Sequence, residues 1–213
     1  MGFMATAPST SARPYRGVDA AERLAGRRTS LLAAGLDLLG ADDSAELTVR
    51  GVCRHAGVAA RYFYESFTDK DEFIGAVFDS VIAELAFATQ AAVDAAPPEE
   101  QTRAGMTTIV RTIGGDRRVG RLLFSVQLAN AVLARKRVES NALFAMLSGR
   151  HAGNTLQVPQ NDRITAAAHF VVGGVAQTIS AWLAGAVRLK PDQLVDQLTS
   201  LVNELGNPSL YRD

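Results

Sequence analysis

The segment from Thr48 to Lys70 constrains the fold more than any other part of the chain. Thr48 stands where a hydroxyl can cap a helix N-terminus, and apolar residues then recur at the spacing of one helix face. Gly57 follows, and glycine adopts the left-handed backbone of a tight turn at little cost. In the next short segment Phe63 and Phe67, four residues apart, can both pack inward. Two short helices joined by a glycine turn predict a helix-turn-helix.

The rest of the chain has the periodicity of helices, and no stretch has the alternation of a strand. An amphipathic helix is predicted over 20–39, the second helix of the turn motif over 59–66, and an irregular loop over 149–160, which contains glycine, asparagine and proline. We therefore predict an all-α fold in which a small N-terminal unit precedes a larger helical bundle. The predicted boundaries are a disordered tail over 1–18, a three-helix unit over 19–67 and the bundle over 68–213.

Composition limits the kinds of site that the chain can carry. Lys+Arg and Asp+Glu are equal at 22 each, so any contact with DNA must come from a local basic patch. The single cysteine, Cys53, excludes an intrachain disulfide and fits a cytoplasmic location. The three histidines lack metal-ligand spacing, and no set of catalytic residues stands in a suitable context, so we predict no metal, no cofactor and no enzyme activity.

The stretch from Thr165 to Val187 contains no charged residue, which raises the possibility of a membrane span. His169 and Gln177 interrupt it, however, and glycine and alanine dominate over leucine and isoleucine. A helix that is apolar all round can be buried in protein as well as in lipid. We therefore predict a helix buried against other helices and no membrane contact.

Two segments, RRTSLLAAGLDLLG and TVRGVCRHAGVAARYFYESFTDKDEF, resemble the DNA-binding domain of the TetR (tetracycline-repressor-like) transcriptional regulators. The match covers roughly residues 27–75, and RYFYESF resembles the actinobacterial branch of the family. The later segment GGVAQTISAWLAG with the leucine-rich end of the chain is similar to the dimerisation helices of that family. The residues in register with the family pattern are Thr48, Val49, Ala56, Gly57, Val58, Tyr64, Phe67, Lys70, Asp71 and Glu72.

Two departures from the family pattern fall near the predicted site. Asp43 replaces a common glycine after the first helix, and Ala59, Ala60 and Arg61 replace a common Ser-Lys-Gly or Ser-x-x at the start of the second helix of the motif. The base contacts typical of the family therefore do not transfer to these positions.

The resemblance implies a transcriptional regulator, a repressor that a small and apolar effector releases from a near-palindromic DNA operator. Arg61 and Tyr62 are the candidates for reading bases, although a phosphate contact or simple packing stays open for both. Thr48, Tyr64 and Lys70 are candidates for phosphate contacts, since Lys70 joins a positive charge to a helix N-terminus. The predicted DNA-binding residues are Thr48, Arg50, Ala59, Ala60, Arg61, Tyr62, Tyr64, Glu65 and Lys70.

The bundle is expected to form a homodimer, because one reading helix contacts too few bases and a two-fold pair reads successive major grooves. The predicted dimer residues are Val171, Val175, Thr178, Ile179, Trp182, Leu194, Leu198, Leu201, Val202 and Leu205. The predicted effector-binding residues, for which plain core packing is the alternative, are Phe87, Met106, Ile109, Phe124, Gln127, Met146, Phe170 and Gln177. The competing function is a helical small-molecule receptor or partner-binding protein that binds no operator.

Overall fold

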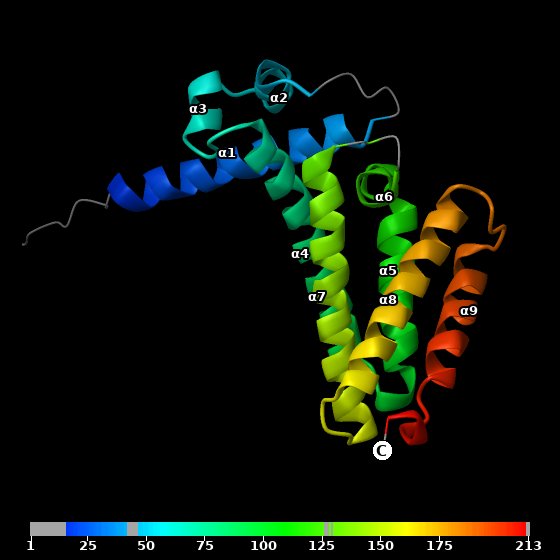
Figure 1. The fold of residues 1–213 in the computed structure, drawn as a ribbon. Helices are drawn as coiled ribbons and strands as arrows, with labels where there is room; N and C mark the ends of the chain where they lie inside the picture. The colour runs from blue at the N-terminus through cyan, green and yellow to red at the C-terminus, as the bar shows by residue number, and fades with distance from the viewer. Residues whose placement is uncertain (1–15, 42–46, 126–127, 129, 212–213) are drawn as a thin grey trace, which may run out of the picture.

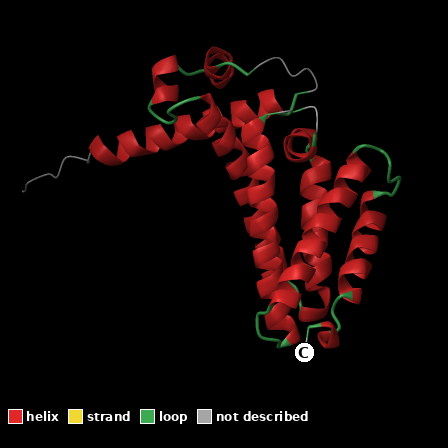
Figure 2. Ribbon diagram, in the orientation of Figure 1, coloured by secondary structure: helices red, strands yellow, loops and turns green. Residues whose placement is uncertain are grey.

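The computed structural model describes residues 16–41, 47–125, 128 and 130–211, and this part of the chain contains helices and no strand (Figures 1 and 2). A small unit of three helices lies across one end of a bundle of longer helices (Figure 1). The helices are α1 (Arg16–Leu39), α2 (Val49–Ala56), α3 (Ala60–Tyr64), α4 (Lys70–Ala95), α5 (Gln101–Gly115), α6 (Arg117–Phe124), α7 (Ala131–Leu156), α8 (Asp162–Leu183) and α9 (Pro191–Glu204), with 3-10 turns η1 (Pro98–Glu100) and η2 (Pro208–Leu210).

The N-terminal unit follows the predicted pattern with small differences at helix ends. Helix α1 begins at Arg16, before the predicted start at residue 20, and so includes the last three residues of the predicted tail. The rest of that tail, and Asp43, lie outside the described residues. Helix α3 is shorter than the predicted 59–66, because the chain turns away after Tyr64 and closes with a hydrogen bond from the Phe67 N–H to the Phe63 carbonyl.

An aromatic cluster fixes α3 to the start of α4. Phe63, Phe67 and Phe73 are at most 2% exposed, and their ring centroids lie 5.0–5.5 Å apart. These separations suit tilted and edge-to-face ring pairs. Because α3 has only five residues, its own hydrogen bonds cannot hold it, and this packing must do so.

Helix α4 runs from the N-terminal unit into the bundle and connects the two (Figure 1). Along its length Phe73, Val77, Phe78, Val81 and Leu85 are buried in one continuous core. Gly35 of α1 lets this helix approach closely, since an added Cβ would lie 2.5 Å from Val77 Cγ2. The N-terminal unit is thus packed directly on the helix that enters the bundle.

The predicted irregular loop over 149–160 is wrong for most of its length, because α7 continues to Leu156 and ends where Gln157 adopts a left-handed backbone with φ of 52°. Gly149 lies inside α7, where a Cβ would come 3.4 Å from Ala168 Cβ of α8. This glycine lets two helices approach closely and does not break the helix.

Helices α4 and α8 are each long and apolar enough to cross a membrane by length and composition. The apolar residues of α4 are buried in the core described above. In α8, by contrast, only Ile164, Ala168 and Ile179 are buried among the described residues. Much of the apolar surface of α8 therefore faces outward.

Candidate nucleic-acid interface

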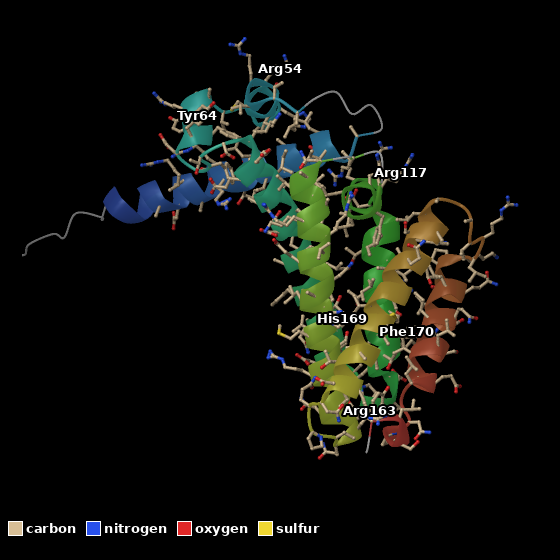
Figure 3. All side chains as sticks on the ribbon, in the orientation of Figure 1. Arg54, Tyr64, Arg117, Arg163, His169 and Phe170 are labelled. Carbon is tan, nitrogen blue, oxygen red and sulfur yellow. The ribbon has the colours of Figure 1, made fainter. Side chains whose placement is uncertain are left out.

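Helix α2 is capped at both ends as the sequence predicts. The Thr48 Oγ1 accepts a hydrogen bond from the Gly51 N–H at 3.1 Å, and Gly57 ends the helix with φ of 68°. Cys53 is buried on the inner face, whereas Arg50 and Arg54 are exposed on the outer one. Figure 3 shows Arg54 and Tyr64 at the end of the molecule away from the bundle. The outer face of α2 thus presents two arginines beside the capped helix start.

Helix α3 presents small residues first and aromatic and charged residues next. Ala59 and Ala60 are exposed at its start, where small side chains leave room for close approach of a second surface. Arg61 is exposed, and its Nη2 donates to the Tyr62 hydroxyl at 2.7 Å. Tyr64 is 61% exposed, with its ring edge-on to Phe63 at 5.4 Å between centroids. Aromatic and basic side chains therefore form the outer face of α3, as a surface that contacts DNA requires.

Side-chain hydrogen bonds define the start of α4, where Lys70 lies. The Asp69 Oδ1 accepts from the Glu72 N–H at 2.8 Å, which makes Asp69 the N-cap of α4. The Glu72 carboxylate in turn accepts from the Thr68 N–H at 2.7 Å and from the Thr68 hydroxyl, and these hydrogen bonds hold the pKa of Glu72 below its ordinary value. Lys70 is partly buried at this rigid helix N-terminus, a favourable place for a phosphate.

Arg27 of α1 also belongs to this face, although sequence reasoning did not select it. Its Cζ lies over the Tyr62 ring, 4.2 Å from the centroid, and its Nη2 is 3.4 Å from the Glu65 carboxylate. No local pattern could reveal these contacts, because Arg27 and Glu65 are 38 residues apart. The arginine pair at positions 27 and 28, within a helix predicted to be amphipathic, is the only signal that the sequence offers.

A polar cluster connects the N-terminal unit to α6 of the bundle. Asp37 of α1 shares a 2.9 Å hydrogen bond with the His55 Nε2 of α2 and accepts another from Arg118 of α6. Arg118 also donates to Asp116, and this hydrogen bond lowers the pKa of Asp116. Burial raises the pKa of Asp37, but the hydrogen bonds from His55 and Arg118 outweigh it and leave the pKa lowered. The cluster therefore joins α1, α2 and α6 through side-chain hydrogen bonds.

The predicted effector-binding residues do not surround one cavity in the described part of the chain. Phe87, Met146 and Phe170 are 79%, 51% and 72% exposed, and Gln177 is exposed as well. Gln127 lies outside the described residues. The remaining three, half-buried against the main core, are Met106, Ile109 and Phe124.

A surface cleft of about 430 Å³ lies between α7 and α8, and Met146 is the one predicted effector-binding residue in its wall. Arg150, Gln160 and His169 form its polar side. This cleft is open to solvent and does not lie in the interior of the bundle, where the predicted residues were expected to meet.

The predicted dimer residues of α8 and α9 need a correction. Ile179, Leu194 and Leu198 are at most 2% exposed within the chain's own core, so a second chain cannot reach them. Trp182 packs on Gly114, where an added Cβ would be 2.5 Å from the ring. Of the other predicted residues Leu201 is 54% exposed, and those that are half-buried are Val171, Val175, Thr178, Val202 and Leu205.

The outward face of α8 consists of other residues. Ala166, Phe170, Gly173, Gly174 and Gln177 are all exposed and follow one another along the helix. Phe170, labelled in Figure 3, is the largest of them. From Thr165 onward α8 has no charged residue, so its sequence has no polar periodicity that separates the inward face from the outward face, and the burial of Ile179 could not be predicted from it.

Comparison with protein families places the same residues in a known context. Residues 31–77 match the family model described as "Bacterial regulatory proteins, tetR family". This match spans the C-terminal part of α1, all of α2 and α3, and the start of α4. Comparison with curated proteins finds no match.

Solved structures share the fold over most of the chain. The fatty acid degradation regulator FadR from Bacillus halodurans has a TM-score of 0.69 at 14% identity, covering 83% of this chain and 94% of its own. FadR from Bacillus subtilis in complex with stearoyl-CoA has a TM-score of 0.66 at 13% identity, with 82% and 96% covered. AibR in complex with isovaleryl coenzyme A and operator DNA has a TM-score of 0.58 at 17% identity, with 83% and 97% covered.

Proposed function

Because this chain belongs to the TetR family of bacterial transcriptional regulators, we propose that it acts in the cytoplasm as a homodimeric repressor that a small-molecule effector releases from a near-palindromic operator. The observation that carries the proposal is the outer face of the helix-turn-helix. Arg61 and Tyr64 are exposed on a short helix that the buried Phe63 fixes in place, and Thr48 and Lys70 stand at the two helix starts that flank it.

The two groups of residues have different tasks. Thr48, Tyr64 and Lys70 contact the phosphate backbone and position the protein, which gives affinity without sequence preference. Arg61 enters the major groove, where a guanidinium can bond both acceptors of a guanine and so distinguish it from other bases. In a two-fold dimer the two copies of α3 lie about 34–36 Å apart, one turn of DNA.

Binding titrations of the purified chain with labelled duplexes at several salt concentrations test this division. We expect Lys70→Ala to weaken binding to cognate and scrambled duplexes alike and to make the salt slope shallower by about one unit per chain. We expect Arg61→Ala to lower the preference for the cognate duplex and to leave scrambled duplexes nearly unaffected. An equal loss on both duplexes for Arg61→Ala would contradict the base-reading role. An absence of salt-dependent binding by the unaltered chain would instead support a receptor that binds no operator.

We assign dimerisation to the outward face of α8. This face is exposed and uncharged, and two glycines on it allow a second helix to approach closely, since nothing lies within 4 Å of a Cβ added at Gly173 or Gly174. A lipid surface is the less suitable partner because His169 and Gln177 lie on the same helix and are exposed. Leu201 of α9, which is 54% exposed, can extend the interface.

Gly173→Leu gives a sharp test of this interface. The added side chain meets nothing in the chain itself and replaces a poor helix former with a good one, so it should not destabilise the monomer. It should, however, prevent close approach of a partner helix. Sedimentation analysis should show a dimer for the unaltered chain and for Ala83→Leu, an exposed position on α4, and a monomer for Gly173→Leu. A dimer in all three cases would show that the outward face of α8 is not the dimer interface.

The effector is proposed to act through α6. Arg118 at the N-terminal end of this helix bonds Asp37 of α1, which in turn bonds His55 of α2. A ligand that binds the bundle and shifts α6 would therefore change the orientation of the N-terminal unit relative to the bundle. This requires that the ligand bind one of the two orientations more tightly than the other.

Two of the similar structures contain acyl-CoA thioesters, namely stearoyl-CoA and isovaleryl coenzyme A. These compounds, together with the free fatty acids, are the first to test against the protein–operator complex. Release of DNA by a ligand, with a matching decrease in ligand affinity when DNA is bound, would support the regulatory proposal because such coupling is reciprocal.

A further inference from the structure

Arg61, the proposed base-reading residue, contacts Tyr62, and Tyr62 in turn contacts Arg27 of α1. The Tyr62 ring lies under two guanidinium groups, with the Arg27 Cζ 4.2 Å and the Arg61 Cζ 4.7 Å from the ring centroid. Arg61 also donates through Nη2 to the Tyr62 hydroxyl at 2.7 Å. Tyr62 therefore contacts Arg61 through both its ring and its oxygen, and contacts the first helix through Arg27.

Arg27 has a second contact at Glu65, the residue that caps the C-terminal end of α3. Its Nη2 lies 3.4 Å from the Glu65 Oε2, and residues 62 and 65 are neighbours on the helix surface at a spacing of three. The Arg27 side chain is 25% exposed, against 45% for Glu65, so Arg27 is the more enclosed member of the pair. One guanidinium from α1 thus contacts an aromatic ring and a carboxylate on the same face of the reading helix.

These contacts give Arg27 and Arg61 different tasks. The charge of Arg27 is engaged by Glu65 and by the Tyr62 ring, which leaves it poorly placed to serve as a mobile phosphate clamp. Arg61 uses one Nη2 hydrogen toward Tyr62, and a guanidinium carries five N–H donors in a rigid plane. The donors that remain can bond a guanine while the plane is held in one orientation.

We propose that Arg27, which lies outside the helix-turn-helix, is a positioning residue for sequence preference, because it fixes Tyr62 and through Tyr62 the orientation of Arg61. The inference rests on the proposed function as a DNA reader. Holding the Arg61 side chain in one orientation lowers the conformational entropy that it loses when it binds DNA. The planar guanidinium gains from this only at a partner that presents two acceptors in the same plane, such as a guanine. The contribution should therefore be made at the cognate base pair and not at the phosphates.

The experiment compares variants of the full chain on an operator selected by the unaltered protein and on duplexes that each change one base pair. Arg27→Lys keeps the charge but loses the planar group, so the preference at the base pair that Arg61 reads should fall about tenfold. Affinity for non-specific DNA and the salt slope should stay unchanged. Tyr62→Phe keeps the ring and removes the hydroxyl, and it should reduce the preference at the same base pair.

Arg28→Lys is the matched control, since Arg28 lies on the same helix and its Cζ is 4.6 Å from the ring centroid of Phe67 and not over Tyr62. It should leave the preference unchanged. The proposal is overturned if Arg27→Lys weakens all duplexes equally, which would make Arg27 a phosphate contact or a fold-stabilising residue, or if it changes nothing. Thermal unfolding of each variant separates loss of fold from loss of preference. An unaltered protein that selects no sequence would overturn the proposed function itself and this proposal with it.

Discussion

Replacing Phe63 should separate the residues that hold the reading helix from those that contact DNA. The Phe63 side chain is 0% exposed, and its ring contacts the rings of Tyr64, Phe67 and Phe73 at centroid distances of 5.4, 5.5 and 5.2 Å. Truncation of such a buried ring to alanine costs about 3–5 kcal/mol. Since domains are stable by only about 5–15 kcal/mol, Phe63→Ala should lose a large share of the free energy of unfolding.

Tyr64→Phe is the matched control from the next position of the same helix. Tyr64 is 61% exposed, so loss of its hydroxyl should change the free energy of unfolding by less than about 0.5 kcal/mol. The same change should weaken DNA binding on all duplexes, because the hydroxyl is proposed to contact phosphate. Urea denaturation at one protein concentration gives the first quantity and fluorescence anisotropy the second. A loss below about 1 kcal/mol for Phe63→Ala, or an equal loss for Tyr64→Phe, would refute the role of the aromatic cluster.

Three further predictions concern the contacts behind the reading face. Gly40→Ala places a Cβ 2.5 Å from the Arg118 Cβ and 2.6 Å from the Arg118 Cα. This substitution should lower the free energy of unfolding in urea denaturation by about 1–3 kcal/mol. An unchanged free energy of unfolding would disprove the close approach of α1 and α6. Because the pKa of Asp37 is lowered in the folded chain, its stabilising contribution is present above its ordinary value of 3.8 and is lost as the pH falls through the folded pKa. Asp37→Asn should therefore flatten the loss of stability below about pH 4, and an identical acid profile would contradict the cluster. Cys53 is 4% exposed, and burial raises the pKa of its thiol, so a thiol reagent should label it only after unfolding, while rapid labelling of the native chain would place the thiol at the surface.

Local patterns in the sequence were sufficient to predict the helix-turn-helix of the N-terminal unit. Thr48 caps the start of α2 and Gly57 ends it through contacts with residues three or four positions away, and the structure has both where they were predicted. Phe63 and Phe67 were predicted to point inward because four residues make about one turn, and both are buried. Caps and short apolar patterns depend on neighbouring residues, so a sequence reveals them.

Contacts between distant segments were not predictable in the same way. The Arg27–Glu65 pair spans 38 residues and the Arg118–Asp37 pair spans 81 residues, and neither leaves a local pattern. From Thr165 onward α8 contains no charged residue, and such a sequence is compatible with burial of either face. The inward residue Ile179 was therefore predicted at the dimer interface and the outward residue Phe170 in a pocket. The position of the reading face followed from local chemistry, whereas its connections and the dimer surface required the three-dimensional structure.

Sequencing of random duplexes enriched by the purified chain shows whether it recognises a specific DNA sequence. We expect a near-palindromic sequence whose half-sites are one helical turn apart, with a guanine at the position that loses preference in Arg61→Ala. Enrichment of no sequence, together with binding that does not respond to salt, would contradict the assignment of this chain as a sequence-specific DNA reader.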